Sequence, residues 1–133
     1  VLRGARVTLY VDYYTLSASC FGGKAALEDL SNGGVAIFVF SPVGKDASYK
    51  DRPVLHTKMA LIAKKSTGKK SVIQGSANLT KAARTVNSEM VTHFPDDTDA
   101  YTALKAFIDT KIAPHSLKLS DSLSLSDNQD ASH

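Results

Sequence analysis

L-H-T-K-M-A-L-I occupies residues 55–62, near the middle of a chain of 133 residues. In an extended strand, side chains two residues apart point to the same face, so His56 and Lys58 are expected to project together. Ala60 and Ile62 would follow them on that face. An imidazole and an ammonium group would thus share one direction at the start of this strand.

S-V-I-Q-G-S-A-N occupies residues 71–78, and the segment K-K-S-T-G-K-K at 64–70 joins it to the first apolar run. Two apolar runs separated by a short turn that contains glycine predict a β-hairpin. Gly75, Ser76 and Asn78 would lie at the end of the second strand, where short polar side chains can face a ligand. Together with the imidazole and the ammonium group they suit a phosphate. We interpret the lysines of the turn as solvating it, in preference to binding phosphate.

Upstream, residues 7–11, V-T-L-Y-V, form a short β-branched run that is typical of a covered strand. Residues 24–30 have apolar positions at helical spacing, and the S-N-G-G that follows can end a helix. Residues 35–40 are another apolar strand. A strand, a helix and a strand in this order predict a βαβ unit. The expected fold class is therefore α/β, with a mixed, largely parallel sheet covered by helices.

Downstream, residues 79–84 fit a short helix, and residues 89–94, E-M-V-T-H-F, fit a strand. Residues 99–112 carry apolar side chains at helical spacing, with Thr98 as the expected N-cap and Pro114 as the end.

The last part of the chain is rich in serine, aspartate and leucine. We expect one domain over residues 1–114 and a polar tail over 115–133 that is either disordered or docked. Docking would use the leucines of the tail, which are Leu117, Leu119, Leu123 and Leu125.

The composition, with 43% hydrophobic and 22% charged residues, allows a moderate core. The formal charge of +3 and the isoelectric point near 9.0 permit an anionic partner without requiring one. Cys20 is the only cysteine, which excludes a disulfide within the chain and a cysteine-rich metal site. No apolar run approaches the ~20 residues that span a bilayer, and the sequence does not indicate a cellular compartment.

Three short motifs together resemble those of the phospholipase D superfamily. They are His56-x-Lys58, Gly75-Ser76-x-Asn78 and Asn87-Ser88-Glu89. The stretch G-S-A-N-L-T-K-A-A-R-T-V-N-S-E is most similar to the small bacterial endonucleases of that superfamily, which carry one motif per chain and dimerise. The resemblance covers residues 1–112, and two linked motifs are far more specific than H-x-K alone.

The sequence departs from the family pattern in two ways. Ala63 stands where the family has an aspartate, five positions after the lysine. In the family, a first strand and a first helix precede the segment that corresponds to Val1 onward. We expect this chain to lack both elements. The chain would then be a fragment, or another chain would fill their place.

The resemblance assigns a role to each candidate residue. His56 is the expected nucleophile, because a neutral imidazole can attack phosphorus and form a phosphohistidine. Lys58 and Asn78 would bind the non-bridging oxygens, Ser76 would add a hydroxyl, and Glu89 would orient the imidazole. No metal and no other cofactor are expected.

The expected function is that of a phosphodiesterase, with a nuclease-type activity on DNA or RNA. The second histidine that the family chemistry requires would come from a homodimer partner or from a missing part of the same protein. The basic charge, the endonuclease-like segment and the lack of an amphipathic membrane helix favour nucleic acid over lipid. Two alternatives stay open: a phospholipase D or phosphatidyltransferase that acts on phospholipid, and an inactive phosphate-binding or interaction domain.

Overall fold

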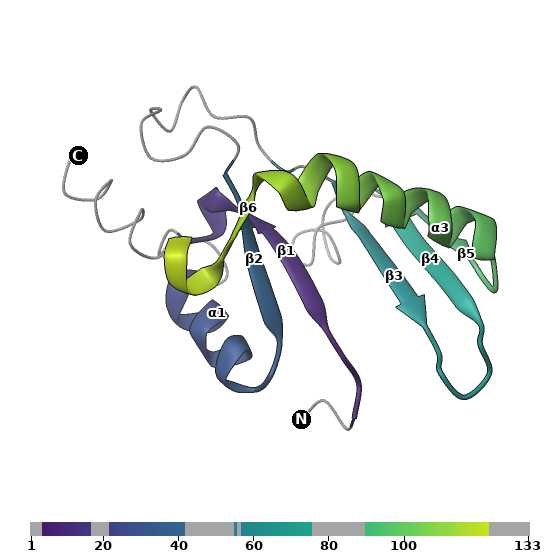
Figure 1. Ribbon diagram of the computed structural model, residues 1–133, viewed down its shortest axis with the longest axis horizontal. Coiled ribbons are helices and arrows are strands. Elements are labelled where there is room, and N and C mark those ends of the chain that lie inside the picture. The colour runs from purple at the N-terminus through teal and green to yellow at the C-terminus, as the bar shows by residue number, and fades with distance from the viewer. Residues whose placement is uncertain (1–3, 17–21, 42–54, 56, 76–89, 123–133) are drawn as a thin grey trace. The chain divides into compact units, whose positions relative to one another are not determined.

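The computed structural model describes residues 4–16, 22–41, 55, 57–75 and 90–122 (Figure 1). The chain forms two compact units. Unit 1 contains residues 1–55 and 111–133, and unit 2 contains residues 56–110. The boundary near residue 114 that we expect from the sequence stays a prediction.

Unit 1 is built on a βαβ arrangement. Strand β1 (Thr8–Asp12) and strand β2 (Ala36–Phe40) are parallel neighbours, and helix α1 (Gly23–Asn32) connects them by way of the 3₁₀ turn η1 (Tyr13–Leu16). The helix ends where Gly33 donates its backbone N–H to the carbonyl oxygens of Asp29 and Leu30. Gly34 follows with φ 103°, a conformation that favours glycine. The predicted βαβ unit and its glycine stop are confirmed.

A third strand, β6 (Ser116–Lys118), pairs antiparallel with β2 and gives the strand order β1-β2-β6 (Figure 1). Leu119 follows it and is 6% exposed. The described part of the expected tail is therefore docked, whereas Leu123 and Leu125 lie outside the described residues. The buried side chains of this core, apart from Leu119, are Tyr13, Leu16, Leu27, Ile37 and Val39.

Unit 2 contains an antiparallel sheet in the order β3-β4-β5, with bounds Met59–Ala63, Lys70–Gly75 and Val91–Phe94. The predicted hairpin is confirmed: Lys64 donates its backbone N–H to the carbonyl oxygen of Lys69 at 2.9 Å, and Gly68 turns the chain with φ 70°. The predicted strand over residues 89–94 is also present, although it begins at Val91.

The expectation of a largely parallel sheet is not confirmed. Among the described strands, β1–β2 is a parallel pair, whereas β2–β6, β3–β4 and β4–β5 are antiparallel pairs. The turn between β3 and β4 is too short for the crossover of a dozen or more residues that a parallel pair needs. The mixed α/β class holds, and the missing first strand and helix stay a prediction.

Helix α3 (Thr98–Phe107) begins one residue earlier than the sequence suggests. Its N-cap is Asp97, whose Oδ1 accepts the backbone N–H of Ala100 at 2.9 Å, so the expectation of Thr98 as the cap is wrong. Asp97 has extended backbone geometry, which is what a cap requires. A π-helical turn, η3 (Ile108–Ile112), and a 3₁₀ turn, η4 (Ala113–His115), continue the segment.

Helix α3 packs against β4 and β3, on one face of their sheet (Figure 1). Lys70 marks this face, because its Nζ lies 5.2 Å from the ring centroid of Tyr101 on the helix. Val72 is two residues further along β4, points the same way and is fully buried. Ile62 belongs to the opposite face and is 47% exposed. The short helix predicted over residues 79–84 lies outside the described residues.

Candidate functional site

Lys58 of the H-x-K motif and Gly75 of the G-S-x-N motif lie at one end of the unit 2 sheet. Because β3 and β4 are antiparallel, the start of β3 lies beside the end of β4. Gly75 donates its backbone N–H to the carbonyl oxygen of Lys58 at 3.2 Å. His56 precedes Lys58 by two residues, and Ser76 is bonded to Gly75. The chain segments that carry the predicted residues therefore attach at this edge.

Four of the five predicted site residues, His56, Ser76, Asn78 and Glu89, lie outside the described residues. Their roles stay predictions. Lys58 is described, is half-buried and immediately precedes β3.

Gly75 also marks the point where a third strand reaches the same edge. Gly75 pairs with Val91 at the start of β5. A Cβ at position 75 would lie 2.8 Å from the Cα of Val91 and closer still to the carbonyl oxygen of Met90. Only glycine permits this approach, which gives the glycine of G-S-x-N a structural reason. Glu89 directly precedes Met90, so its segment attaches at this edge as well.

In unit 1, Asp12 ties down the segment that leads to His56. It ends β1, and its Oδ1 accepts the backbone N–H of Leu55 at 2.8 Å, while its Oδ2 accepts that of Tyr14 at 2.9 Å. Leu55 immediately precedes His56 in the sequence. Asp12 is not among the site residues that the sequence predicts. A carboxylate at the carboxyl end of a parallel strand was the available signal, since such ends commonly carry functional groups.

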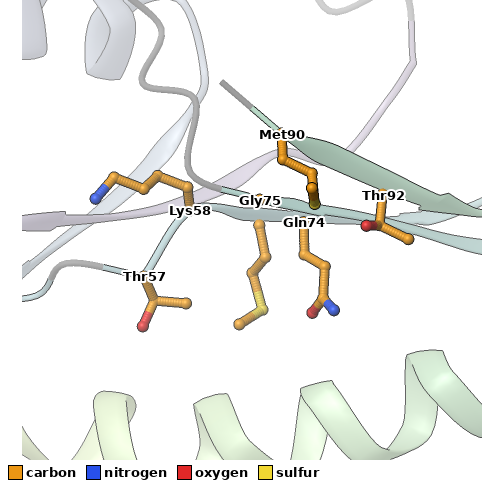
Figure 2. Close-up of a pocket in the computed structure, with 7 residues that line it drawn as sticks. Thr57, Lys58, Gln74, Gly75, Met90 and Thr92 are labelled. Atoms are coloured by element: carbon orange, nitrogen blue, oxygen red, sulfur yellow. The ribbon is translucent and has the colours of Figure 1, made fainter. Parts of the chain in front are cut away.

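An open pocket of about 430 Å³ lies beside Lys58 (Figure 2). Thr57 and Gln74 point to the side of the sheet on which α3 packs, whereas Lys58 extends in another direction. The amide and hydroxyl groups can donate hydrogen bonds to oxygen atoms of a ligand, and the methionine sulfurs can contact an apolar group. Gln74 is not among the residues predicted from the sequence, because the direction of its side chain depends on the strand register. The full lining is Thr57, Lys58, Met59, Gln74, Gly75, Met90 and Thr92.

The described part of the chain shows neither a metal cluster nor a membrane-spanning helix. In it, no three His, Cys, Asp or Glu side chains lie close enough to hold a metal ion. None of its helices is long and apolar enough to cross a membrane.

The family model described as "Cardiolipin synthase, PLD-like domain" matches residues 1–110. The chain belongs to this family of phospholipase D-like (PLD-like) domains. No curated protein and no solved structure gives a match. Such domains generally catalyse phosphodiester hydrolysis or transfer. The resemblance to the phospholipase D superfamily is thus confirmed, while the closer resemblance to the small endonucleases stays a prediction.

The structure also shows where this PLD-like domain departs from the H-K-D pattern. Ala63, at the usual aspartate position, ends β3 and pairs with Lys70. Five residue steps of extended chain, about 17 Å, separate it from Lys58. The replacement of the aspartate therefore removes no group from the end of the sheet where Lys58 and Gly75 meet.

Proposed function

We propose that this PLD-like domain is a nuclease-type phosphodiesterase that acts on DNA or RNA through a phosphohistidine intermediate. One observation carries the proposal. Lys58, Gly75 and Met90 lie together at one sheet edge, and each borders a segment that contains a predicted catalytic residue. A single phosphodiester group could then meet an imidazole, an ammonium group and an amide at once.

The first chemical step is displacement at phosphorus. Nε2 of His56 attacks, a P–N bond forms, and the P–O bond to the leaving group breaks. A second histidine donates a proton to the leaving oxygen. Lys58 and Asn78 stabilise the negative charge that accumulates on the non-bridging oxygens, with the hydroxyl of Ser76 as a further donor.

The second step regenerates the imidazole. A water molecule attacks phosphorus while the second histidine accepts its proton, and the P–N bond breaks. Glu89 accepts a hydrogen bond from Nδ1 of His56, which leaves Nε2 free to attack and stabilises the positive charge of the ring.

The second histidine requires a second motif. A twofold-related copy of the chain would supply its own His56, so that two incomplete sites form one complete site. A further part of a longer protein could supply it equally well. In the homodimer case, activity per chain should rise with protein concentration and reach a plateau.

Nucleic acid is the favoured substrate because the chain is basic, with a formal charge of +3. The description of the family model favours a second candidate, a phosphatidyltransferase or phospholipase D that acts on phospholipid. A third candidate is an inactive domain that binds phosphate without cleaving a bond.

The deciding experiment incubates the protein with EDTA and either single-stranded DNA or phosphatidylglycerol vesicles, and identifies the products. We expect DNA cleavage that His56→Ala abolishes while DNA binding is retained. His93→Ala, a change at an exposed histidine on β5, is the matched control and should cleave normally. Full cleavage by His56→Ala would contradict the mechanism. Headgroup exchange on vesicles without DNA cleavage would establish the lipid candidate. No product from either substrate, together with phosphate binding that His56→Ala weakens, would favour the third.

A further inference from the structure

Positive charge is concentrated in one stretch of the sequence. Between Asp51 and Glu89 there are eight lysine and arginine residues and no aspartate or glutamate. The rest of the chain carries the other eight basic residues and all 13 acidic ones. The part of the chain that contains the candidate site is therefore strongly basic, although the net charge of the whole is only +3.

The turn between β3 and β4 presents part of this charge to solvent. Lys64, Lys65 and Lys69 are exposed on the turn, which projects from the end of the two strands (Figure 1). These three form no ion pair with any residue that the structure describes. Among the described residues, the ion pair is between Lys105 of α3 and Asp109 of η3. We refer to the three side chains as the turn lysines.

The neighbouring charged groups belong to other interactions. Lys70 lies over the ring of Tyr101. The carboxylate of Asp97 caps α3, and the backbone N–H of Asp96 donates to Oγ of Ser71 on β4. Because β4 lies between β3 and β5, these two aspartates are on the β5 side of the sheet. Neither aspartate therefore lies on the β3 side of the turn lysines.

The turn and the candidate site lie at opposite ends of the same strands. Six residue steps separate Lys58 from Lys64, or about 20 Å of extended chain. A single phosphodiester group reaches only one of these positions. A nucleic acid has a phosphate at every nucleotide, with a rise of about 3.4 Å per nucleotide in a duplex strand, so about six nucleotides span the distance. Membrane-surface segments add Trp, Phe or Leu to their lysines, and the turn has none.

We propose that the turn lysines Lys64, Lys65 and Lys69 bind the phosphate backbone of a nucleic acid whose reacting phosphodiester lies at the Lys58 end of the sheet. This proposal replaces the interpretation from the sequence that these lysines only solvate the turn. This surface rests on the proposed function, because it extends the same substrate beyond the reacting group. The turn lysines increase the affinity for nucleic acid and make that affinity depend on salt concentration, but they do not recognise the base sequence.

The test compares two triple variants that each remove three positive charges. One is Lys64→Ala/Lys65→Ala/Lys69→Ala. The control is Arg6→Ala/Lys111→Ala/Lys118→Ala, three exposed positions in unit 1. Fluorescence anisotropy measures binding of a labelled 20-nucleotide single strand over a range of salt concentrations. Bis(p-nitrophenyl) phosphate is too small to reach from Lys58 to the turn. Its hydrolysis rate therefore measures the reaction at the Lys58 end alone.

We expect the turn variant to bind the 20-mer about 10-fold more weakly at low salt. Its slope of log affinity against log salt should fall by about 2, since each single-strand phosphate contact contributes about 0.7. Hydrolysis of the small substrate should not change. Unchanged affinity and slope, or an equal loss in the control, would overturn the proposal. So would a loss confined to phosphatidylglycerol vesicles. If the wild type does not hydrolyse the small substrate, the proposed function fails while the binding comparison still tests the turn.

Discussion

The backbone N–H of Leu55 donates to the carboxylate of Asp12 at 2.8 Å, although 43 residues separate them in the sequence. This hydrogen bond joins the end of β1 to the residue directly before His56. The other carboxylate oxygen is occupied by the N–H of Tyr14. Asp12 therefore holds Leu55, the last residue of the first segment of unit 1, in place.

Replacement of Asp12 should slow the reaction more than it weakens substrate binding. Asp12→Ala removes both acceptor oxygens, and misplacement of a catalytic group by about 1 Å can cost about 100-fold in rate. We expect kcat on a small phosphodiester to fall by about 10-fold or more, with KM nearly unchanged. Asp12→Asn keeps one acceptor oxygen and should recover part of the rate.

Thermal unfolding separates this positioning effect from loss of fold. Asp29→Ala, a change at an exposed aspartate on α1, is the control and should leave both kcat and stability near the wild-type values. A parallel fall of kcat and stability in Asp12→Ala, with no recovery in Asp12→Asn, would mean that Asp12 acts only through the fold.

Gly75→Ala should destabilise the protein. The new methyl group would overlap the backbone of Met90 and Val91, and backbone atoms cannot rotate away as a side chain can. Overpacking of this kind costs about 1–3 kcal/mol or more, which a urea titration measures. Gly33→Ala is the matched control, because its Cβ would lie 3.4 Å from the nearest atom, the carbonyl oxygen of Leu30. Equal stability of the two variants would contradict the close approach at Gly75.

Restoring the aspartate of the family at position 63 should have little effect on the reaction. Ala63→Asp places a carboxylate across from Lys70 at the far end of β3. Opposite charges on paired strands contribute a few tenths of a kcal/mol at an exposed site, so the unfolding midpoint should rise slightly. Ala63→Asn tests whether the rise depends on charge. A large increase of kcat in Ala63→Asp would show that this position does act on the Lys58 end.

The cap of α3 provides a test of local structure. Asp97→Ala should lower the free energy of unfolding by about 1 kcal/mol, since the N–H of Ala100 loses its acceptor. Thr98→Ala should change it by less. A denaturant titration measures both losses. A larger loss in Thr98→Ala than in Asp97→Ala would show that Thr98 is the N-cap, as the sequence alone suggests.

The elements found correctly from the sequence are those with a strong local pattern. The apolar strand, the helical spacing and the paired glycines of residues 7–40 predict β1, α1 and β2. The lysine-rich turn with Gly68 predicts the β3–β4 hairpin. Lys58 and Gly75 are then neighbours, because the open ends of the two strands of an antiparallel hairpin lie side by side.

The features missed from the sequence depend on partners that are distant along the chain. β6 has only three residues, and its pairing with β2 cannot be read from the weak alternation around Leu117. The cap at Asp97 was missed because two neighbouring residues are both good caps, and backbone geometry selects one of them. The need for glycine at position 75 depends on where β5 begins.

The pairing of β2 with β6 also bears on how the protein folds as it is synthesised. Unit 2 is one continuous segment, whereas unit 1 is completed by residues that follow it. On the ribosome, β1, α1 and β2 emerge first, yet Leu119, which is part of their core, emerges only after the whole hairpin and α3. Because domains generally fold as units during synthesis, unit 2, which contains the candidate site, should reach its native contacts before β6 completes the sheet of unit 1.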